Sequence, residues 1–125
     1  MASASAHYLS ALARFADFDG RASRAELWSF FGVHVAVVLV LLAVSAVLGT
    51  VLDLGWVAGS LVLALYLALT FFPALSAVAR RLHDTGRSSF WVALALIPVI
   101  GLWLVVWLLE AGDPAPNEWG QPPEA

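Results

Sequence analysis

Three long apolar runs follow one another along the chain, separated by short polar stretches. They cover residues 28–52, 56–79 and 90–109, with few polar side chains inside them. An α-helix rises about 1.5 Å per residue, so each run is long enough to cross a hydrocarbon core about 30 Å thick. The pattern predicts an all-α polytopic membrane protein with three transmembrane helices, a short N-terminal interfacial helix and a disordered C-terminal tail.

Polar residues between the runs set the expected boundaries. The stretch Ser23-Arg24-Ala25-Glu26 has the form of a capping box, in which the Ser hydroxyl accepts a backbone N–H and the Glu carboxylate reaches back. A first helix is therefore expected from Arg24. The whole chain, 1–125, is expected to be one membrane domain, divided as follows: 1–23 N-terminal cytoplasmic or interfacial segment, 24–52 first span, 55–79 second span, 80–89 cytoplasmic loop, 90–109 third span, 110–125 tail.

The third run has a second possible structure. Pro98 and Gly101 lie at its centre, where a re-entrant hairpin could fold. Each arm of such a hairpin has only about eight residues, which is too short to cross the membrane, so a single bent span is the favoured prediction. The tail has four prolines after Gly112, which forbid another helix and predict an extended or disordered segment.

The N-terminal segment has no apolar core of signal-peptide length, so we expect it to remain in the mature protein. Tyr8, Leu12 and Phe15 recur at helical spacing and mark one face of a short helix. This pattern indicates a helix in the headgroup region, and a poorly ordered terminus is the alternative.

Composition and charge agree with a membrane protein and orient it. Hydrophobic residues make up 62% of the chain and charged residues 12%, against about 25% charged in soluble domains. The chain has no cysteine, which excludes disulfides and thiolate metal sites. Positive-inside orientation predicts a cytoplasmic N-terminus and a tail on the outside, because every basic residue precedes the first run or lies between the second and third: Arg14, Arg21, Arg24, Arg80, Arg81 and Arg87.

Two segments resemble the signature stretches of a known family. Residues 18–28, Phe-Asp-Gly-Arg-Ala-Ser-Arg-Ala-Glu-Leu-Trp, and residues 80–89, Arg-Arg-Leu-His-Asp-Thr-Gly-Arg-Ser-Ser, resemble the domain of unknown function 805 family, small bacterial inner-membrane proteins of the YhaH type. The likeness continues through 97–101 and into 112–120. It implies a helical fold in the bacterial inner membrane and implies no activity.

One polar cluster is the candidate site. A functional interpretation makes its guanidinium groups a clamp for phosphate, on a lipid headgroup or a small anion. The alternative is structural: the arginines fix topology, Asp84 pairs with one of them, and Ser88 or Ser89 caps the third helix. Glu26 is expected to pair with Arg80 or Arg81. The candidate residues are Arg21, Arg24, Glu26, Arg80, Arg81, His83, Asp84 and Arg87.

Inside the spans, two further features predict helix contacts. Ser45 and Gly49 in the first span, and Gly55 and Gly59 in the second, are small residues four apart, which lets helices approach closely in lipid. His34 has no acidic partner at similar depth, so a neutral hydrogen bond to a neighbouring helix is expected.

Three classes of function remain open. The first is a non-enzymatic membrane protein acting by helix association and anionic-lipid or phosphate binding at the cytoplasmic cluster. The second is an oligomeric small transporter or channel subunit, and the third is a lipid-modifying enzyme using His83. Common hydrolase, phosphate-loop and zinc motifs are missing from the sequence, so no enzyme and no cofactor are predicted. The expected partners are the lipid bilayer, anionic phospholipids and a homo-oligomer or membrane complex, with no nucleic acid.

Overall fold

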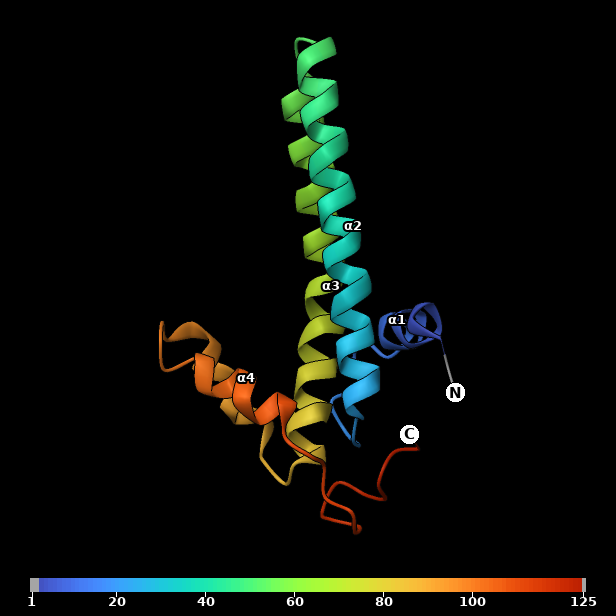
Figure 1. Cartoon of the computed structure of the whole chain (residues 1–125), viewed down its shortest axis with the longest axis vertical. Helices are drawn as coiled ribbons and strands as arrows, with labels where there is room; N and C mark the ends of the chain where they lie inside the picture. Colours follow the sequence, from blue (N-terminus) through green and yellow to red (C-terminus); the bar gives the residue numbers. More distant parts are fainter. Residues whose placement is uncertain (1–2, 125) are drawn as a thin grey trace.

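The computed structural model describes residues 3–124, and its elements in that range are all helices, as predicted (Figure 1). The only β pairing among these residues is an isolated bridge between Asn117 and Gly120. The elements, in chain order, are α1 (Ala4–Ala13), α2 (Arg24–Val51), α3 (Gly55–Asp84), the 3-10 helix η1 (Ser89–Leu96) and α4 (Leu102–Leu109).

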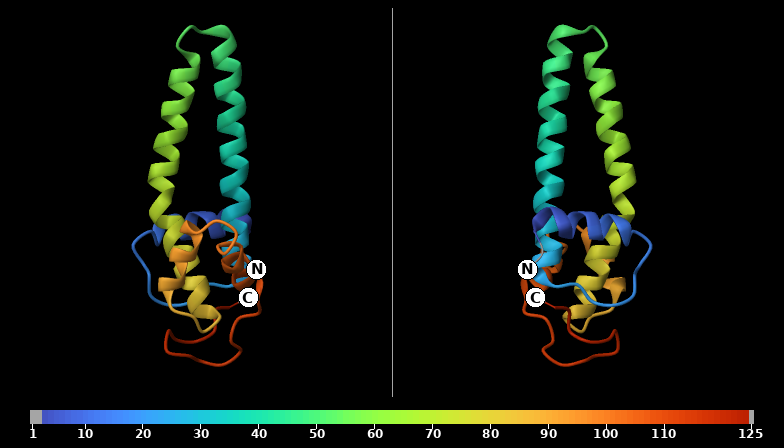
Figure 2. Two further views of the ribbon diagram at one scale, coloured as in Figure 1. Left: turned by 90° about the vertical axis from the view of Figure 1, so that its left-hand side faces the viewer. Right: turned by 90° about the vertical axis from the view of Figure 1, so that its right-hand side faces the viewer.

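The two long helices α2 and α3 form an antiparallel hairpin that dominates the molecule (Figures 1 and 2). α2 has 28 residues and α3 has 30, and both are apolar enough to cross a membrane. Their outward side chains include large exposed aliphatic groups such as Leu39 at 60% and Leu69 at 68%. A soluble helix pair of this kind would expose an apolar surface far larger than water tolerates, so these helices are candidate membrane spans.

Small residues hold α2 and α3 close together near their connecting turn. A Cβ added at Gly59 would collide with the hydroxyl of Ser45, and one added at Gly49 would collide with the indole of Trp56. At the turn itself, a Cβ on Gly55 would collide with the backbone carbonyl of Leu48. The predicted close approach through Ser45, Gly49, Gly55 and Gly59 is therefore confirmed.

Helix α1 lies across the α2–α3 pair near one end of the long hairpin (Figure 2). The ring of Tyr8 stacks on Phe30 of α2 at 5.4 Å, and its hydroxyl lies 2.8 Å from the hydroxyl of Tyr66 on α3. The Tyr66 hydroxyl also lies 3.0 Å from Nδ1 of His34. The predicted hydrogen bond from His34 to a neighbouring helix is confirmed, and the N-terminal segment is a docked helix.

The prediction of a single continuous helix over 90–109 is wrong. Instead of one continuous helix, this run contains η1 and α4 joined by a turn at residues 97–101. Pro98 removes an N–H and keeps Ile97 extended, with φ −105° and ψ 113°. The Gly101 N–H donates to the Ile97 carbonyl at 2.8 Å and closes the turn. The expected bend is therefore a reversal of the chain.

The predicted loop 80–89 is also wrong over its first half. Helix α3 continues through Arg80–Asp84, and all five of these residues are buried against other parts of the protein. At this end of α3, they pack against the start of α2 and against α4. The buried apolar core of this region comprises Leu27, Ala77, Leu82, Leu104 and Leu108.

Candidate functional site: the arginine–carboxylate junction

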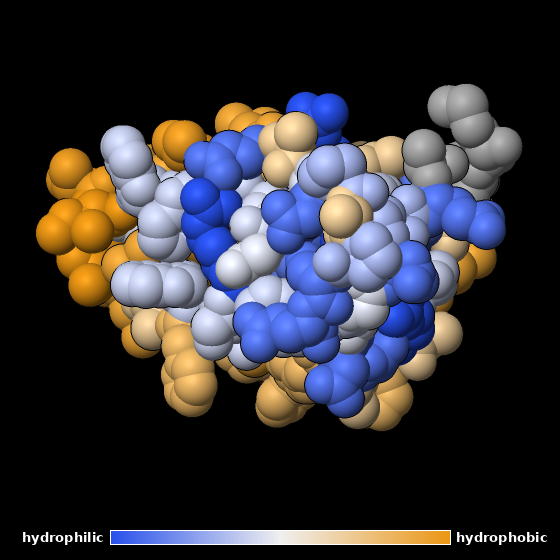
Figure 3. Space-filling model, turned by 90° about the horizontal axis from the view of Figure 1, so that it is seen from below, coloured by the Kyte–Doolittle hydropathy of each residue, from blue (hydrophilic) through white to orange (hydrophobic). Residues whose placement is uncertain are grey.

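One end of the molecule is polar and carries the candidate residues. Seen from below, its centre is hydrophilic and its margins are hydrophobic (Figure 3). The start of α2, the end of α3, the segment before α2 and the C-terminal tail meet there (Figures 1 and 2). We call this region the junction, and it brings together side chains more than 60 residues apart in the sequence.

Asp84 is the centre of the junction. Its Oδ1 accepts from Nε of Arg21 at 2.8 Å, and its Oδ2 binds Nη1 of Arg81, one helical turn earlier. Both guanidinium side chains are 1% exposed and the carboxylate is 5% exposed. Because isolated buried charges are very unfavourable, this arrangement is stable only with all three groups present.

Arg21 also holds the C-terminal tail. Its Nη1 donates to the carbonyl of Ala115 at 2.9 Å, and its Nη2 donates to the carbonyl of Asp113. The Asp113 N–H donates to the Asp84 carbonyl at 2.7 Å, and a Cβ on Gly112 would collide with the Asp84 carboxylate. The tail is non-helical, as predicted. The prediction of a disordered tail is wrong, because the tail binds Arg21 and Asp84 directly.

His83 lies on a different side of α3 from Asp84, as their adjacent positions require. Its ring stacks on Trp119 with centroids 4.6 Å apart and planes inclined by 3°, and its Nδ1 lies 3.0 Å from the Gly20 carbonyl. The Asn117 side-chain amide donates to the His83 carbonyl at 2.9 Å. His83 is 4% exposed. Its contacts with Gly20, Asn117 and Trp119 link the N-terminal segment to the tail.

Arg81 caps helix α4. Its Nε donates to the Leu108 carbonyl at 3.2 Å, and its Nη2 donates to the Glu110 carbonyl. The last carbonyls of a helix have no partner within it and carry a partial negative charge, which a guanidinium satisfies. The position of α4 is therefore tied to the same group that binds Asp84.

Glu26 pairs with Arg80, one of its two predicted partners. The Arg80 Nη1 lies 2.7 Å from the Glu26 Oε1, and the Arg80 side chain is fully buried. The capping box is half formed: the Ser23 hydroxyl accepts from the Glu26 N–H at 3.1 Å, as predicted. The Glu26 carboxylate binds Arg80 instead of reaching back, because a buried guanidinium attracts it more strongly than a neutral N–H does.

Arg14 and Arg87 lie at the edges of the junction. Arg14 Nη2 lies 2.6 Å from Asp17 Oδ2. Burial raises the pKa of Asp17, but the hydrogen bond and charge of Arg14 outweigh burial and hold that pKa below its ordinary value. Arg87 Nη1 lies 2.8 Å from Glu110 Oε2, and its guanidinium lies over the Trp107 ring at 4.6 Å. These exposed pairs contribute less to stability than the buried ones.

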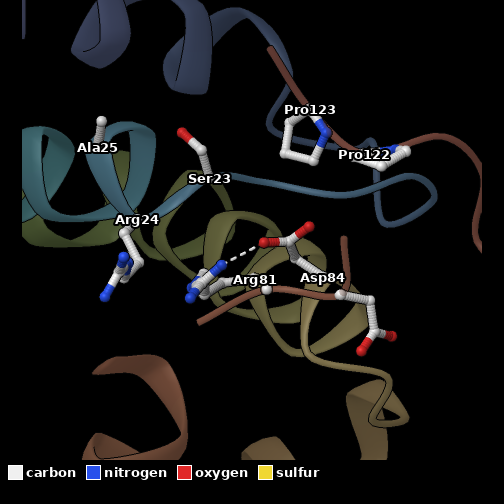
Figure 4. Close-up of a pocket in the computed structure, with 9 residues that line it drawn as sticks. Ser23, Arg24, Ala25, Arg81, Asp84, Pro122 and Pro123 are labelled. Atoms are coloured by element: carbon white, nitrogen blue, oxygen red, sulfur yellow. Dashed lines mark hydrogen bonds and ion pairs between the residues drawn. The ribbon is translucent and has the colours of Figure 1, made fainter. Parts of the chain in front are cut away.

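Arg24 differs from the other arginines. Among the described residues it has no carboxylate within 4.0 Å, and its hydrogen bond to the Leu109 carbonyl is long, at 3.4 Å. It is exposed and lines a cleft of about 440 Å³ together with Arg81. Figure 4 shows both guanidinium groups on one side of this cleft and the tail prolines across it, which form its other wall. The full lining is Ser23, Arg24, Ala25, Arg81, Asp84, Gly112, Asp113, Pro122 and Pro123.

The predicted residues thus gather at one end but serve different contacts. Arg21, Arg81 and Asp84 form one buried group, Glu26 and Arg80 form a second, and the remaining residues have separate environments. Sequence reasoning missed the tail residues that complete the junction, Asp113, Asn117 and Trp119. Their signal was the Gly112–Gly120 motif, which resembles the family but looked unstructured because of its prolines.

A long apolar helix pair over a junction of paired arginines defines a small helical membrane protein. The chain belongs to the family described as "Protein of unknown function (DUF805)", which matches residues 15–121. It is 38% identical over 119 residues to inner membrane protein YhaI of Escherichia coli K12, covering 94% of each chain. It is 37% identical over 118 residues to inner membrane protein YhaH of the same strain, covering 94% of this chain and 95% of YhaH.

The resemblance predicted from the two signature stretches is confirmed by these matches. A third relative, uncharacterized protein YiiR of E. coli K12, is 33% identical over 104 residues, which is 82% of this chain and 60% of YiiR. No solved structure matches the chain. Together with the two membrane-capable helices, the relatives support an inner-membrane protein.

Proposed function

We propose that this protein is a non-enzymatic inner-membrane protein that crosses the bilayer twice and acts by association at a cytoplasmic junction. Its ligand there is a phosphate-bearing group, in the first place an anionic lipid headgroup. The observation that carries this proposal is the difference between Arg24 and the other arginines: the others each have a carboxylate partner, whereas Arg24 faces an open cleft.

Charge supports the orientation. All six basic residues belong to segments at the junction end, whereas the α2–α3 turn carries only Asp53. Basic residues in short loops next to the spans remain in the cytoplasm, and acidic residues have little influence on orientation. The junction, α1 and the tail are then all cytoplasmic, and the α2–α3 turn is outside.

The cleft chemistry limits how an anion binds. Arg24 is a rigid, permanently charged donor that matches phosphate oxygens bidentately. Asp84 and Asp113 also line the cleft and repel an anion, so a phosphate is confined to the Arg24 rim. This rim lies beside α4, at the end of the spans where headgroups lie.

The proposal is tested by lipid retention. The protein is purified in nanodiscs of phosphatidylcholine with or without phosphatidylglycerol or cardiolipin, and bound lipid is counted by native mass spectrometry. Arg24→Gln should lower retention of anionic lipid roughly fivefold, since one charge near the surface contributes about 1 kcal/mol. The control Arg14→Gln removes a guanidinium that is already paired. Competition by inorganic phosphate separates a headgroup ligand from a free anion, and equal retention by both variants contradicts the proposal.

A further inference from the structure

The segment between Ser88 and Glu110 leaves the junction and returns to it. Arg87 Nη1 lies 2.8 Å from Glu110 Oε2, which joins the two ends of the segment. Arg81 binds the Leu108 carbonyl at 3.2 Å and fixes the returning end to α3. A chain whose ends are joined in this way cannot begin on one side of a membrane and finish on the other.

The hairpin of η1 and α4 is apolar on every side. No charged or hydrogen-bonding side chain other than the tryptophan indoles occurs from Phe90 to Leu109. Phe90 is 89% exposed, Leu96 is 85% exposed and Val99 is 80% exposed. Such a surface is covered by lipid or by protein, because water does not tolerate an apolar patch of this extent.

The backbone of the turn satisfies most of its own hydrogen bonds. The Ile97 N–H donates to the Leu94 carbonyl at 3.0 Å, the Gly101 N–H donates to the Ile97 carbonyl at 2.8 Å, and the Leu102 N–H donates to the Val99 carbonyl at 3.0 Å. Pro98 has no N–H to satisfy. Irregular backbone exposed to lipid is excluded from the depth of the hydrocarbon core, because unpaired polar groups are costly there. This turn pairs most of its own polar groups, which favours a shallow position near the headgroups.

The base of the hairpin has the residues typical of a membrane interface. Trp91 and Trp107 meet edge to face with centroids 5.4 Å apart, and the Arg87 guanidinium lies over Trp107 at 4.6 Å. Indole rings and guanidinium groups prefer the headgroup region. The turn, orange in Figure 1, is the part of the hairpin farthest from the α2–α3 pair, and the hairpin leaves α3 obliquely. Polarity therefore falls from base to tip.

We infer that the η1–α4 hairpin inserts obliquely into the single leaflet that adjoins the junction, with lipid acyl chains as its partner. The inference rests on the two-span arrangement proposed above. Each arm has eight residues. The eight-residue α-helix α4 is about 12 Å long and the eight-residue 3-10 helix η1 is about 16 Å long, against about 15 Å for half of the hydrocarbon core. Because the hairpin is oblique, its tip stays within one leaflet. Because Arg81 joins α4 to Asp84, the depth of the hairpin is coupled to the junction.

Single-cysteine spin labelling tests this inference, and the natural chain has no cysteine to remove. Labels are placed at Ile100 in the tip, Leu39 in the middle of α2 and Glu118 in the tail, all exposed positions. Accessibility to oxygen and to an aqueous nickel chelate gives the depth of each label in phosphatidylethanolamine–phosphatidylglycerol vesicles. We expect Ile100 at a depth between Glu118 and Leu39. A depth equal to that of Glu118, or at or beyond that of Leu39, overturns the inference.

A second labelling experiment separates failure of the hairpin from failure of the two-span arrangement. A membrane-impermeant maleimide is added to intact cells and to inverted vesicles carrying Leu54→Cys or Glu118→Cys. Opposite-side labelling of these two positions supports the two spans and the hairpin return together. Labelling of both from the same side overturns the return of residues 88–110 to the junction, and with it the one-leaflet hairpin.

Discussion

The guanidinium of Arg80 and the carboxylate of Glu26 lie 2.7 Å apart, joining the end of α3 to the start of α2. The two residues are 54 positions apart in the sequence, and the guanidinium is fully buried. Arg80 also accepts, through its carbonyl, the N–H of Ala22 at 3.0 Å. Arg80 thus contacts both the segment just before α2 and the first turn of α2, which closes the base of the long hairpin.

Glu26→Gln should destabilise the protein strongly. The substitution leaves the buried Arg80 charge without its partner, and breaking one side of a buried pair costs about 3–5 kcal/mol. Denaturant unfolding in bicelles, followed by circular dichroism, measures the loss. Asp17→Asn is the control, because the Arg14–Asp17 pair is 39% exposed on each side and contributes less than about 1 kcal/mol. Equal losses in the two variants would show that the Glu26 pair has no special structural role.

Gly59→Leu should separate α2 from α3. Even a Cβ at this position collides with Ser45, so a leucine forces the helices apart at a cost of about 1–3 kcal/mol. Thermal unfolding in detergent measures the effect. Gly32→Leu is the matched control, because nothing lies within 4 Å of a Cβ built there. A stable Gly59→Leu protein would contradict close packing of the two helices.

Tyr66→Phe should destabilise the protein more than Tyr8→Phe does. The Tyr66 hydroxyl lies 2.8 Å from that of Tyr8 and 3.0 Å from Nδ1 of His34, so its removal loses two hydrogen bonds, each of about 1 kcal/mol. Tyr8→Phe loses one of them. Thermal unfolding in nanodiscs, followed by circular dichroism, measures both losses. A larger effect of Tyr8→Phe would contradict the hydrogen-bond chain from Tyr8 through Tyr66 to His34.

Trp119→Ala should release the tail from the junction. The substitution removes the ring that stacks on His83 at 4.6 Å and leaves one face of a buried imidazole uncovered. Backbone amides of residues 112–124 should then exchange hydrogen at least several-fold faster in mass spectrometry, since an interaction of about 1 kcal/mol corresponds to about fivefold. Glu118→Ala, at an exposed neighbouring position, should leave exchange unchanged. Unchanged exchange in Trp119→Ala would refute the stacking contact as the tail's anchor.

Local chemistry was enough to predict the long helices and several of their contacts. Three local features each imply a specific contact that the structure contains: the Ser23 cap, the small residues around Gly59, and the absence of an acidic partner for His34. The Glu26–Arg80 pair followed from placing two charged segments at the same membrane surface. These features depend on residues close in sequence or on a single hairpin.

Long-range geometry was not accessible in the same way. The hydropathy of residues 90–109 is the same for one span as for two short helices, and length alone favoured the span. The ion pair between Arg87 and Glu110, which shows that the run returns, is visible only in three dimensions. The contacts of the tail were missed for the same reason. Its prolines exclude a helix, but they do not reveal that Arg21 binds the tail backbone or that His83 stacks on Trp119.

The side of the membrane on which the tail lies tests the two-span arrangement most directly. A tandem alkaline phosphatase–green fluorescent protein reporter fused after Ala125 is active as a phosphatase only outside the cytoplasm and fluoresces only inside it. The structure places the tail against Arg21 and Asp84, so the fusion should fluoresce and show no phosphatase activity. The same reporter inserted at Asp53 should give the opposite signals. Phosphatase activity from the fusion after Ala125 would mean that residues 90–109 cross the membrane and that the junction with the tail does not exist.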